Sequence, residues 1–335
     1  MKKYFKKFKL VLFVFFLSLV SSHPTYAYNN TWIILKEYDA DSVLEVIQDE
    51  VPNLKVNAVS FFSNGWTNLV ADINNEWIFR FPRSESFMLI LEREQILLDR
   101  LREYITLPIP NYEYIGLNTA FVAYRKIPGE SLSEDIYLTL SIETRQEIAN
   151  TLALFLSQLH GAISIEEGYQ LGYCEYQAPL QLIENSLLGT LPSNDIERIV
   201  TESLIYLREH PYDIKQNVFL HNDLHGENFA FDVKLQTVRG VFDFSEAALG
   251  HYSVEFGKLF LVHSDLAMRT SDAYASINGV PNAIILSAVD FILRRCTYLL
   301  HYREVQNETW ISILIKMLED FVPIWDRLLL EKPSL

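Results

Sequence analysis

Four polar residues between positions 221 and 243 have types and spacings that could carry out chemistry on a phosphate. His221, Asp223 and Asn228 form the pattern H-x-D-x-x-x-x-N, and Asp243 follows in the apolar context V-F-D-F. Mg²⁺ takes oxygen ligands and keeps several waters, so the amide oxygen of Asn228 and the carboxylate of Asp243 suit it. Asp223 would receive or orient the proton of an acceptor hydroxyl. The spacing therefore predicts phosphoryl transfer, with Asp223 as the catalytic residue.

Short apolar runs flank these residues and would bring them together. Residues 217–220 and 229–232 are predicted strands on either side of the first loop, and residues 237–242 form a β-branched strand that ends at Asp243. His221 is predicted to be a structural loop residue rather than a catalyst. The alternative is a polar turn between two buried strands without any catalytic role, because Asp, Asn and His are common in loops.

This segment resembles the aminoglycoside phosphotransferase family of protein-kinase-like small-molecule kinases. HNDLHGEN is similar to the family's H-G-D-L-H-x-x-N form, with Asn222 in place of the usual Gly. DFSEAALGHYSVEF resembles its D-F-x-D-A…D-F/L pattern, with Glu246 and Glu255 where Asp is common. Upstream, the likeness is carried by FFSNGWTNLV, EWIFRFPR, LEREQILLDRL and FLSQLHG, so that it covers most of residues 55–260.

The resemblance implies an α+β fold with two lobes, a small antiparallel-sheet N-lobe that binds the nucleotide and a larger, mostly helical C-lobe. The run KIPGESL, with its Pro-Gly breaker, marks the change between lobes. The predicted division is a signal peptide at 1–27, the N-lobe at 28–125 and the C-lobe at 126–335. The apolar spacing predicts C-lobe helices at 143–160, 179–188, 195–210, 254–268, 282–302 and 309–330.

The resemblance also implies residues that would hold ATP or GTP. Arg80 takes the place of a lysine that contacts ATP in many relatives, and a guanidinium can bind phosphate with two nitrogens. Glu94 would be its ion-pair partner, because Glu92 faces another side of the predicted helix 87–104. A solvated charged face is the alternative for Glu94.

Residues 63–66 join two predicted strands, 54–62 and 67–73, and would cover the phosphates. An ordinary hairpin turn is the alternative. Asn68, just after this loop, belongs to the predicted nucleotide site. The same resemblance implies that Ala123 and Arg125 run along the adenine edge and bind the base through their backbone groups.

The first 27 residues have the plan of a secretory signal peptide. A basic segment with five lysines precedes an apolar run of 11 residues, and Thr25 and Ala27 stand at the minus-three and minus-one places of a cleavage site. This apolar run is shorter than the ~20 residues of a membrane-spanning helix. We therefore expect export to the periplasm or the exterior, without stable membrane insertion after cleavage. An uncleaved anchor and a cytoplasmic start are the alternatives.

The chain is acidic, with 43 acidic and 28 basic residues and a formal net charge of -15. Such a field disfavours nucleic acid and anionic membranes, and it favours a cationic acceptor by electrostatic steering. A surface that only aids solubility is the alternative. Four acids of the predicted C-terminal helices could meet a cationic acceptor or could simply be solvated: Asp265, Asp290, Glu319 and Asp320.

These patterns together predict a phosphotransferase that uses Mg²⁺ and ATP or GTP and acts on a hydroxyl of a small molecule. An aminoglycoside-like polyamine sugar is the first acceptor class, supported by the resemblance and by the acidic charge. One alternative is a kinase of another metabolite, such as an amino alcohol or a macrolide, or of a host protein or lipid. Another is a nucleotide-binding pseudokinase that acts as an interaction protein, which the replacement of lysine by Arg80 keeps open.

Overall fold

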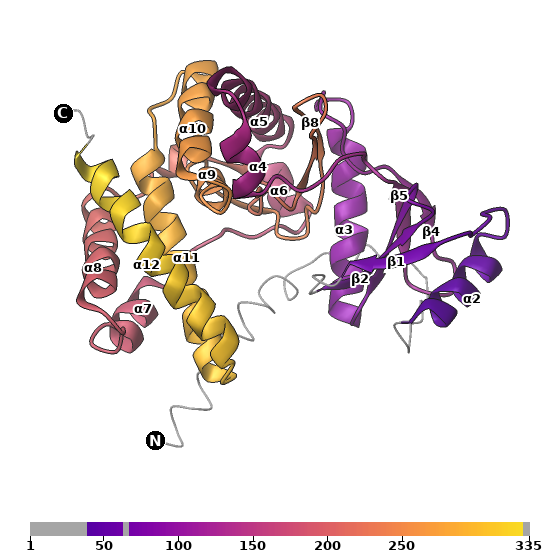
Figure 1. The fold of residues 1–335 in the computed structure, drawn as a ribbon, viewed down its shortest axis with the longest axis horizontal. Helices are drawn as coiled ribbons and strands as arrows, with labels where there is room; N and C mark the ends of the chain where they lie inside the picture. The colour runs from indigo at the N-terminus through magenta and orange to yellow at the C-terminus, as the bar shows by residue number, and fades with distance from the viewer. Residues whose placement is uncertain (1–38, 63–66, 331–335) are drawn as a thin grey trace.

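The computed structural model describes residues 39–62 and 67–330, which form a two-lobed α+β structure (Figure 1). A small lobe contains an antiparallel sheet, and the larger lobe is mostly helical. The predicted signal peptide at 1–27 and the predicted phosphate-covering loop at 63–66 lie outside the described residues. Within the described part of the chain, no helix is both long and apolar enough to span a membrane.

The sheet of the small lobe has the strand order β1-β2-β3-β5-β4, and every neighbouring pair is antiparallel. The strands are β1 (Val59–Phe62), β2 (Asn68–Ile73), β3 (Trp77–Pro82), β4 (Tyr112–Ile115) and β5 (Val122–Arg125). Helix α2 (Ala40–Glu50) begins after Asp39, whose carboxylate accepts the N–H of Ser42. Alternation along β3 directs Phe79 and Phe81 into the lobe's own core. Arg80, between them, therefore faces the other side.

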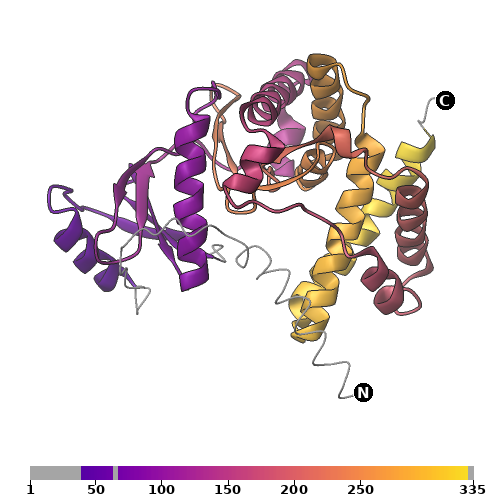
Figure 2. The same ribbon diagram turned by 180° about the vertical axis from the view of Figure 1, so that it is seen from behind.

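Helix α3 (Glu85–Leu101) lies between the sheet and the larger lobe and packs against both, as Figure 2 shows from behind. Leu97, Leu98 and Leu101 on its last turns are buried in the large core of the C-lobe rather than in the core of the sheet. The helix is therefore fixed to the larger lobe at one end while its middle packs beside β3. This arrangement sets the position of Glu94.

The larger lobe is built from helices around one hydrophobic core. Its helices are α4 (Glu134–Thr139), α5 (Ile142–Ala162), α6 (Ile165–Gln170), α7 (Leu180–Leu187), α8 (Asn194–Glu209), the 3₁₀ turn η1 (Ile214–Gln216), α9 (Val254–Leu259), α10 (Ser264–Asn278), α11 (Ile284–Glu304) and α12 (Glu308–Leu330). Helices α4, α5, α6 and α8 each begin after a serine whose hydroxyl accepts a backbone N–H of the first turn. Such caps satisfy backbone donors that have no partner inside the helix.

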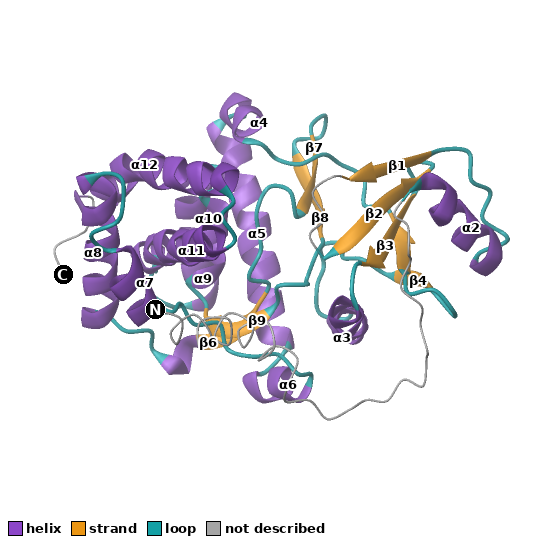
Figure 3. Ribbon diagram, turned by 90° about the horizontal axis from the view of Figure 1, so that it is seen from below, coloured by secondary structure: helices purple, strands orange, loops and turns teal. Residues whose placement is uncertain are grey.

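Two small β-ribbons belong to the larger lobe: β7 and β8 lie on its side toward the small lobe, and β6 and β9 lie beside α6 (Figure 3). Strand β6 (Asn217–Leu220) pairs with β9 (Ala248–His251), and β7 (Phe229–Asp232) pairs with β8 (Thr237–Val241). Both ribbons are antiparallel. The loops that join them therefore bring residues 221–228 and 242–247 to one place.

The structure departs from the predicted elements in three ways. The helix predicted at 254–268 is two helices, α9 and α10, and the break between them contains neither glycine nor proline. It is fixed instead by His263, whose Nδ1 accepts the N–H of Asp265 and caps α10. Strand β9 was not predicted because its residues, Ala-Leu-Gly-His, carry no strong strand signal. The short helices α4 and α6 were also not predicted.

Candidate active site

The loop after β6 is held by buried side chains below it. His221 is fully buried, and its Nδ1 accepts the N–H of Asp223 while its Nε2 donates to the carbonyl of Phe242 (3.3 and 3.2 Å). Burial lowers the pKa of His221, so the neutral ring is favoured. Because Phe242 precedes Asp243, His221 ties the two loops together. Its role is structural.

Asn222 occupies the position at which the family pattern has glycine, and its backbone shows why the exchange is tolerated. Its φ is 66°, in the left-handed region that Asn enters more easily than most residues. The buried carboxylate of Glu255 accepts the backbone N–H groups of both His221 and Asn222. Glu255 therefore fixes this turn from helix α9.

The loop between β6 and β7 requires a glycine at position 226. A Cβ at Gly226 would lie 2.1 Å from the carbonyl oxygen of Leu132, and the Gly226 carbonyl accepts the Leu132 N–H (2.9 Å). Only glycine permits so close an approach of two backbones. This contact fastens the loop to the segment that connects the lobes.

The two oxygens of Asp223 have separate partners. Asn228 donates from Nδ2 to Oδ2 (2.7 Å), and Lys258 on α9 donates from Nζ to Oδ1 (2.6 Å). The imidazole of His225 lies 3.6 Å from Oδ2. Burial alone would raise the pKa of Asp223, but Lys258 and His225 bring it well below its ordinary value. Asp223 is thus an ionised and oriented carboxylate.

Asp243 lies beside Asn228 and faces the small lobe. The N–H of Phe242 donates to the carbonyl of Asn228 (3.0 Å), which joins the two loops by their backbones. The Asp243 side chain is 40% exposed, and its Oδ1 lies 3.3 Å from Nη2 of Arg80. Its φ of 64° is a strained value for a residue with a side chain, and such strain is often found at functional sites.

Arg80 is the residue of the small lobe that contacts Asp243. It is buried, and its Nη1 lies 2.7 Å from Glu94 and 3.2 Å from the Tyr112 hydroxyl. Burial would lower the pKa of the guanidinium, but the charge of Glu94 raises it well above the usual value. Glu94 also accepts the N–H of Phe244 (3.3 Å). One carboxylate therefore joins strand β3, helix α3 and the loop that carries Asp243.

The structure separates the other predicted nucleotide-binding residues from this group. Asn68 is buried at the start of β2, and its Oδ1 has no hydrogen-bond partner, so it could accept one from a ligand. Ala123 pairs with Phe79 and Tyr114 inside the sheet. Arg125 lies over the ring of Trp77, 3.9 Å from its centroid. The contact of Ala123 and Arg125 with the base stays a prediction.

The donor set of the loops fits Mg²⁺. Asn228 uses its nitrogen to bind Asp223, which leaves its amide oxygen for a metal. Asp243 adds a partly exposed carboxylate. Hard oxygen donors of this kind, completed by phosphates and water, are what Mg²⁺ prefers. No cluster of three or more His, Cys, Asp or Glu side chains suited to a metal occurs in the described ranges.

Sequence reasoning missed Lys258 as a member of the site. It lies 35 residues beyond Asp223, in a stretch that reads as an ordinary helix. The sequence does contain one signal. Lys258 is the single lysine in the apolar run Phe256-Gly257-Lys258-Leu259-Phe260, and a lysine on a buried helix usually has a charged partner. The role of Glu255 as a turn clamp was also missed, although its place in the pattern was noted.

The family comes from comparison of the whole chain. A family model described as the phosphotransferase enzyme family matches residues 58–282. The chain belongs to this family. The predicted resemblance is thereby confirmed, and the family match includes every predicted site residue, from Asn68 to Asp243.

Solved structures of family members share the fold. The GDP complex of aminoglycoside 2'-phosphotransferase-IIIa is 22% identical, with a TM-score of 0.74 over 84% of this chain and 97% of that one. The GDP and kanamycin complex of APH(2")-IIIa is 24% identical, with a TM-score of 0.70 over 83% and 97%. Macrolide 2'-phosphotransferase MphH from Brachybacterium faecium is 17% identical, with a TM-score of 0.59 over 83% and 98%. The fold is therefore the protein-kinase-like fold of the aminoglycoside phosphotransferases.

Proposed function

We propose that this family member transfers the γ-phosphate of ATP or GTP to a hydroxyl of a small organic molecule, with Mg²⁺ as its cofactor. The observation that carries the proposal is the meeting of the two lobes at Arg80 and Asp243, next to the Asp223 and Asn228 pair. Family members in solved structures hold GDP, ADP or ATP, which supports a nucleotide donor.

The chain's own residues would divide the work between donor and acceptor. Arg80 would neutralise phosphate charge, while Asn228 and Asp243 would hold Mg²⁺, which neutralises more of that charge when bound. Asp223 would accept a hydrogen bond from the acceptor hydroxyl and thereby direct the hydroxyl oxygen at the γ-phosphorus. As the hydroxyl oxygen bonds to the γ-phosphorus, the bond between that phosphorus and the β–γ bridging oxygen of the nucleotide breaks. The hydroxyl proton leaves toward Asp223 or water.

The first acceptors to assay follow from the relatives. Solved family members have been obtained with kanamycin, gentamicin and streptomycin, and others are macrolide phosphotransferases. The acidic net charge of -15 also favours acceptors with amines at long range. Aminoglycosides and macrolides are therefore the two classes to assay first.

An acceptor panel tests the function. The purified protein is incubated with ATP or GTP, with magnesium or EDTA, and with aminoglycosides, macrolides, amino alcohols and neutral sugars. We expect phosphorylated product by mass spectrometry with at least one acceptor, and only with magnesium. Tight nucleotide binding without turnover on any acceptor would favour the pseudokinase alternative instead.

We also propose that residues 1–27 direct export and are removed after Ala27, on the strength of the basic, apolar and small-residue segments. N-terminal sequencing of the protein from the periplasm or medium should begin at Tyr28. Recovery of a chain that starts at Met1 would contradict this.

A further inference from the structure

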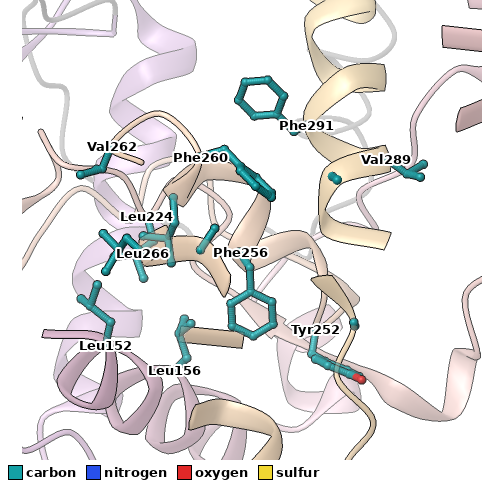
Figure 4. Close-up of a cluster of buried hydrophobic side chains, with 14 of the residues drawn as sticks. Leu152, Leu156, Leu224, Tyr252, Phe256, Phe260, Val262, Leu266, Val289 and Phe291 are labelled. Carbon is teal, nitrogen blue, oxygen red and sulfur yellow. The ribbon is translucent and has the colours of Figure 1, made fainter. Parts of the chain in front are cut away.

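Lys258 is buried beside the residue that would meet the acceptor. Only 6% of it is exposed, and it lies on the six-residue helix α9. The helix is held by the hydrophobic core: Phe256 and Phe260, on either side of Lys258 in the sequence, lie in the same cluster as Leu224, the residue after Asp223 (Figure 4). The backbone of the helix at Lys258 is therefore fixed by packing on both sides, and the contact with Asp223 holds the ammonium group.

Lys258 and Asp223 form a closed pair. The Nζ to Oδ1 distance is 2.6 Å, and the other oxygen of Asp223 is taken by Asn228. Burial would lower the pKa of Lys258, but the charge of Asp223 raises it above the usual value. Both groups are charged, so the carboxylate that faces the acceptor hydroxyl is already neutralised by the protein.

More positive charge lies behind this pair. Arg294 and Arg295 on α11 are buried and close enough to oppose the charge of Lys258. Arg294 is balanced by Asp290, with 3.3 Å between Nε and Oδ2. Arg295 donates to the carbonyl of Phe291 and lies against its ring, and no salt bridge joins it to a carboxylate of the described chain. With the partly buried Asp223 and the buried carboxylate of Glu255, which holds the turn before Asp223, the charged groups here comprise three cations and three anions.

Most of the four C-lobe acids that were considered as contacts for a polyamine acceptor are neutralised by basic residues of the protein itself. Three of them each pair with a basic residue one turn away on the same helix: Asp265 with Arg269, Asp290 with Arg294, and Asp320 with Lys316. Pairs at this spacing satisfy each other without a ligand. Glu246 is a partly accessible residue near the group; burial of its carboxyl and the charge of Asp223 raise its pKa, and it could meet one ammonium at a distance from the reaction.

We propose that Lys258 is a positioning residue that orients Asp223 and cancels its charge, so that the site selects hydroxyl compounds without an ammonium group beside the reacting hydroxyl. This inference rests on the proposed function and narrows its acceptor class away from polyamine sugars. A cation next to the reacting hydroxyl would meet the Lys258 ammonium at short range, which costs binding energy because that ammonium is buried. The acidic surface steers cations only at long range.

Binding of a polycationic probe tests the proposal without requiring turnover. Kanamycin affinity is measured by calorimetry for the full-length wild-type protein and for the Lys258→Met and Lys258→Arg variants. We expect Lys258→Met to bind kanamycin at least tenfold more tightly, because it leaves Asp223 as an unbalanced anion. Lys258→Arg should stay within twofold of wild type. Equal or weaker binding by Lys258→Met would overturn the proposal.

Lys316→Met is a matched control. Lys316 pairs with Asp320 at the same 2.6 Å, but on the surface, with side chains 67% and 62% exposed. Removing it also leaves one acid without its partner, yet kanamycin affinity should change by less than twofold. An equal gain in both lysine variants would show that net charge alone governs binding and would overturn the local role of Lys258.

A second variant covers the case in which Lys258→Met does not fold. Asp223→Asn keeps Lys258 and removes the charge that it balances, so kanamycin should bind at least fivefold more weakly than to wild type. Unchanged affinity would overturn the proposal.

Turnover separates a positioning role from a merely structural one. With whichever acceptor supports transfer, Lys258→Met should lower kcat at least tenfold and leave the KM for the nucleotide within twofold, and Lys258→Arg should recover most of the loss. A rise in nucleotide KM with unchanged kcat would contradict a role on Asp223. Absence of turnover with every acceptor would remove the proposed function, while kanamycin binding would still report on Lys258.

Discussion

Two ion pairs, one in each lobe, differ in what they leave free: the Arg80–Glu94 pair is fully buried, and the Lys258–Asp223 pair is only partly buried. Arg80 and Glu94 lie 2.7 Å apart in the small lobe, and Lys258 and Asp223 lie 2.6 Å apart in the large one. The first pair leaves Nη2 of Arg80 directed at Asp243, so it reaches across to the other lobe. The second pair, with Asn228, occupies both oxygens of its carboxylate. In the proposed function, the first pair would extend a charge toward the donor phosphates, and the second would cancel a charge beside the acceptor.

Replacing Asp223 by Ala should produce the largest effect on activity. We expect phosphotransfer to fall about 10²–10⁴-fold, since the acceptor hydroxyl loses the group that orients it. Nucleotide affinity, which we assign to the Arg80–Glu94 pair, should be largely kept. Product formation by mass spectrometry and nucleotide binding by calorimetry measure the two effects. Turnover close to that of wild type would remove Asp223 from the chemistry.

Arg80→Met should damage stability as well as nucleotide binding. It leaves the buried carboxylate of Glu94 without its cation, which costs about 3–5 kcal/mol in comparable sites. Arg80→Met combined with Glu94→Gln should recover much of the stability but not the nucleotide affinity. Urea unfolding and nucleotide titration of the single and double variants separate these outcomes. Recovery of nucleotide affinity in the double variant would show that Arg80 has only a structural role.

Acid should destabilise the large lobe through a neutral histidine rather than through its ion pair. His251 is buried between Ser253 and Gln216, and burial lowers its pKa to about 4. The unfolded chain binds this proton near pH 6.5, so stability falls as pH drops from 6.5 to 4, by up to about 3 kcal/mol. In His251→Gln, the unfolding free energy should depend less steeply on pH in that window. An unchanged pH dependence of the unfolding free energy would show that groups other than His251 cause the acid sensitivity.

The turn above the large-lobe pair offers the smallest test. Asn222→Gly keeps the positive φ but loses hydrogen bonds to Glu246 and Arg294, whereas Asn222→Ala also forces an alanine into the left-handed region. Alanine should therefore be less stable than glycine here, by about 1 kcal/mol. Thermal unfolding compares the two. Equal stability would mean that the turn relaxes without φ strain.

The contrast between the two pairs also marks how far sequence reasoning reached. Asp223, Asn228 and Asp243 could be found because they follow one another at fixed intervals around short strands. Arg80 and Glu94 could be matched because their segments resemble a family pattern. Lys258 could not, because its contact with Asp223 depends on how the helix predicted at 254–268 breaks after α9, and that break is set by the cap at His263 rather than by a breaker residue.

The fold was largely predictable for a related reason. Strands and long helices with regular apolar spacing were found nearly at their observed bounds, as for α12 and β7. The short elements α4, α6 and β9 were missed because tertiary contacts, rather than local pattern, decide their conformation. Residues such as Ala123 show the same limit, since its place inside the sheet follows from strand pairing with Phe79 and Tyr114.

The proposed function requires that Arg80 of one lobe and Asp243 of the other form a single magnesium-nucleotide site. Magnesium titration of nucleotide binding by calorimetry, in wild type and in Asp243→Ala, tests it most directly. We predict that the wild type binds ATP or GTP in a magnesium-dependent manner, and that Asp243→Ala needs at least about tenfold more magnesium, since it loses one of two protein ligands. The same magnesium dependence in both proteins would contradict the claim.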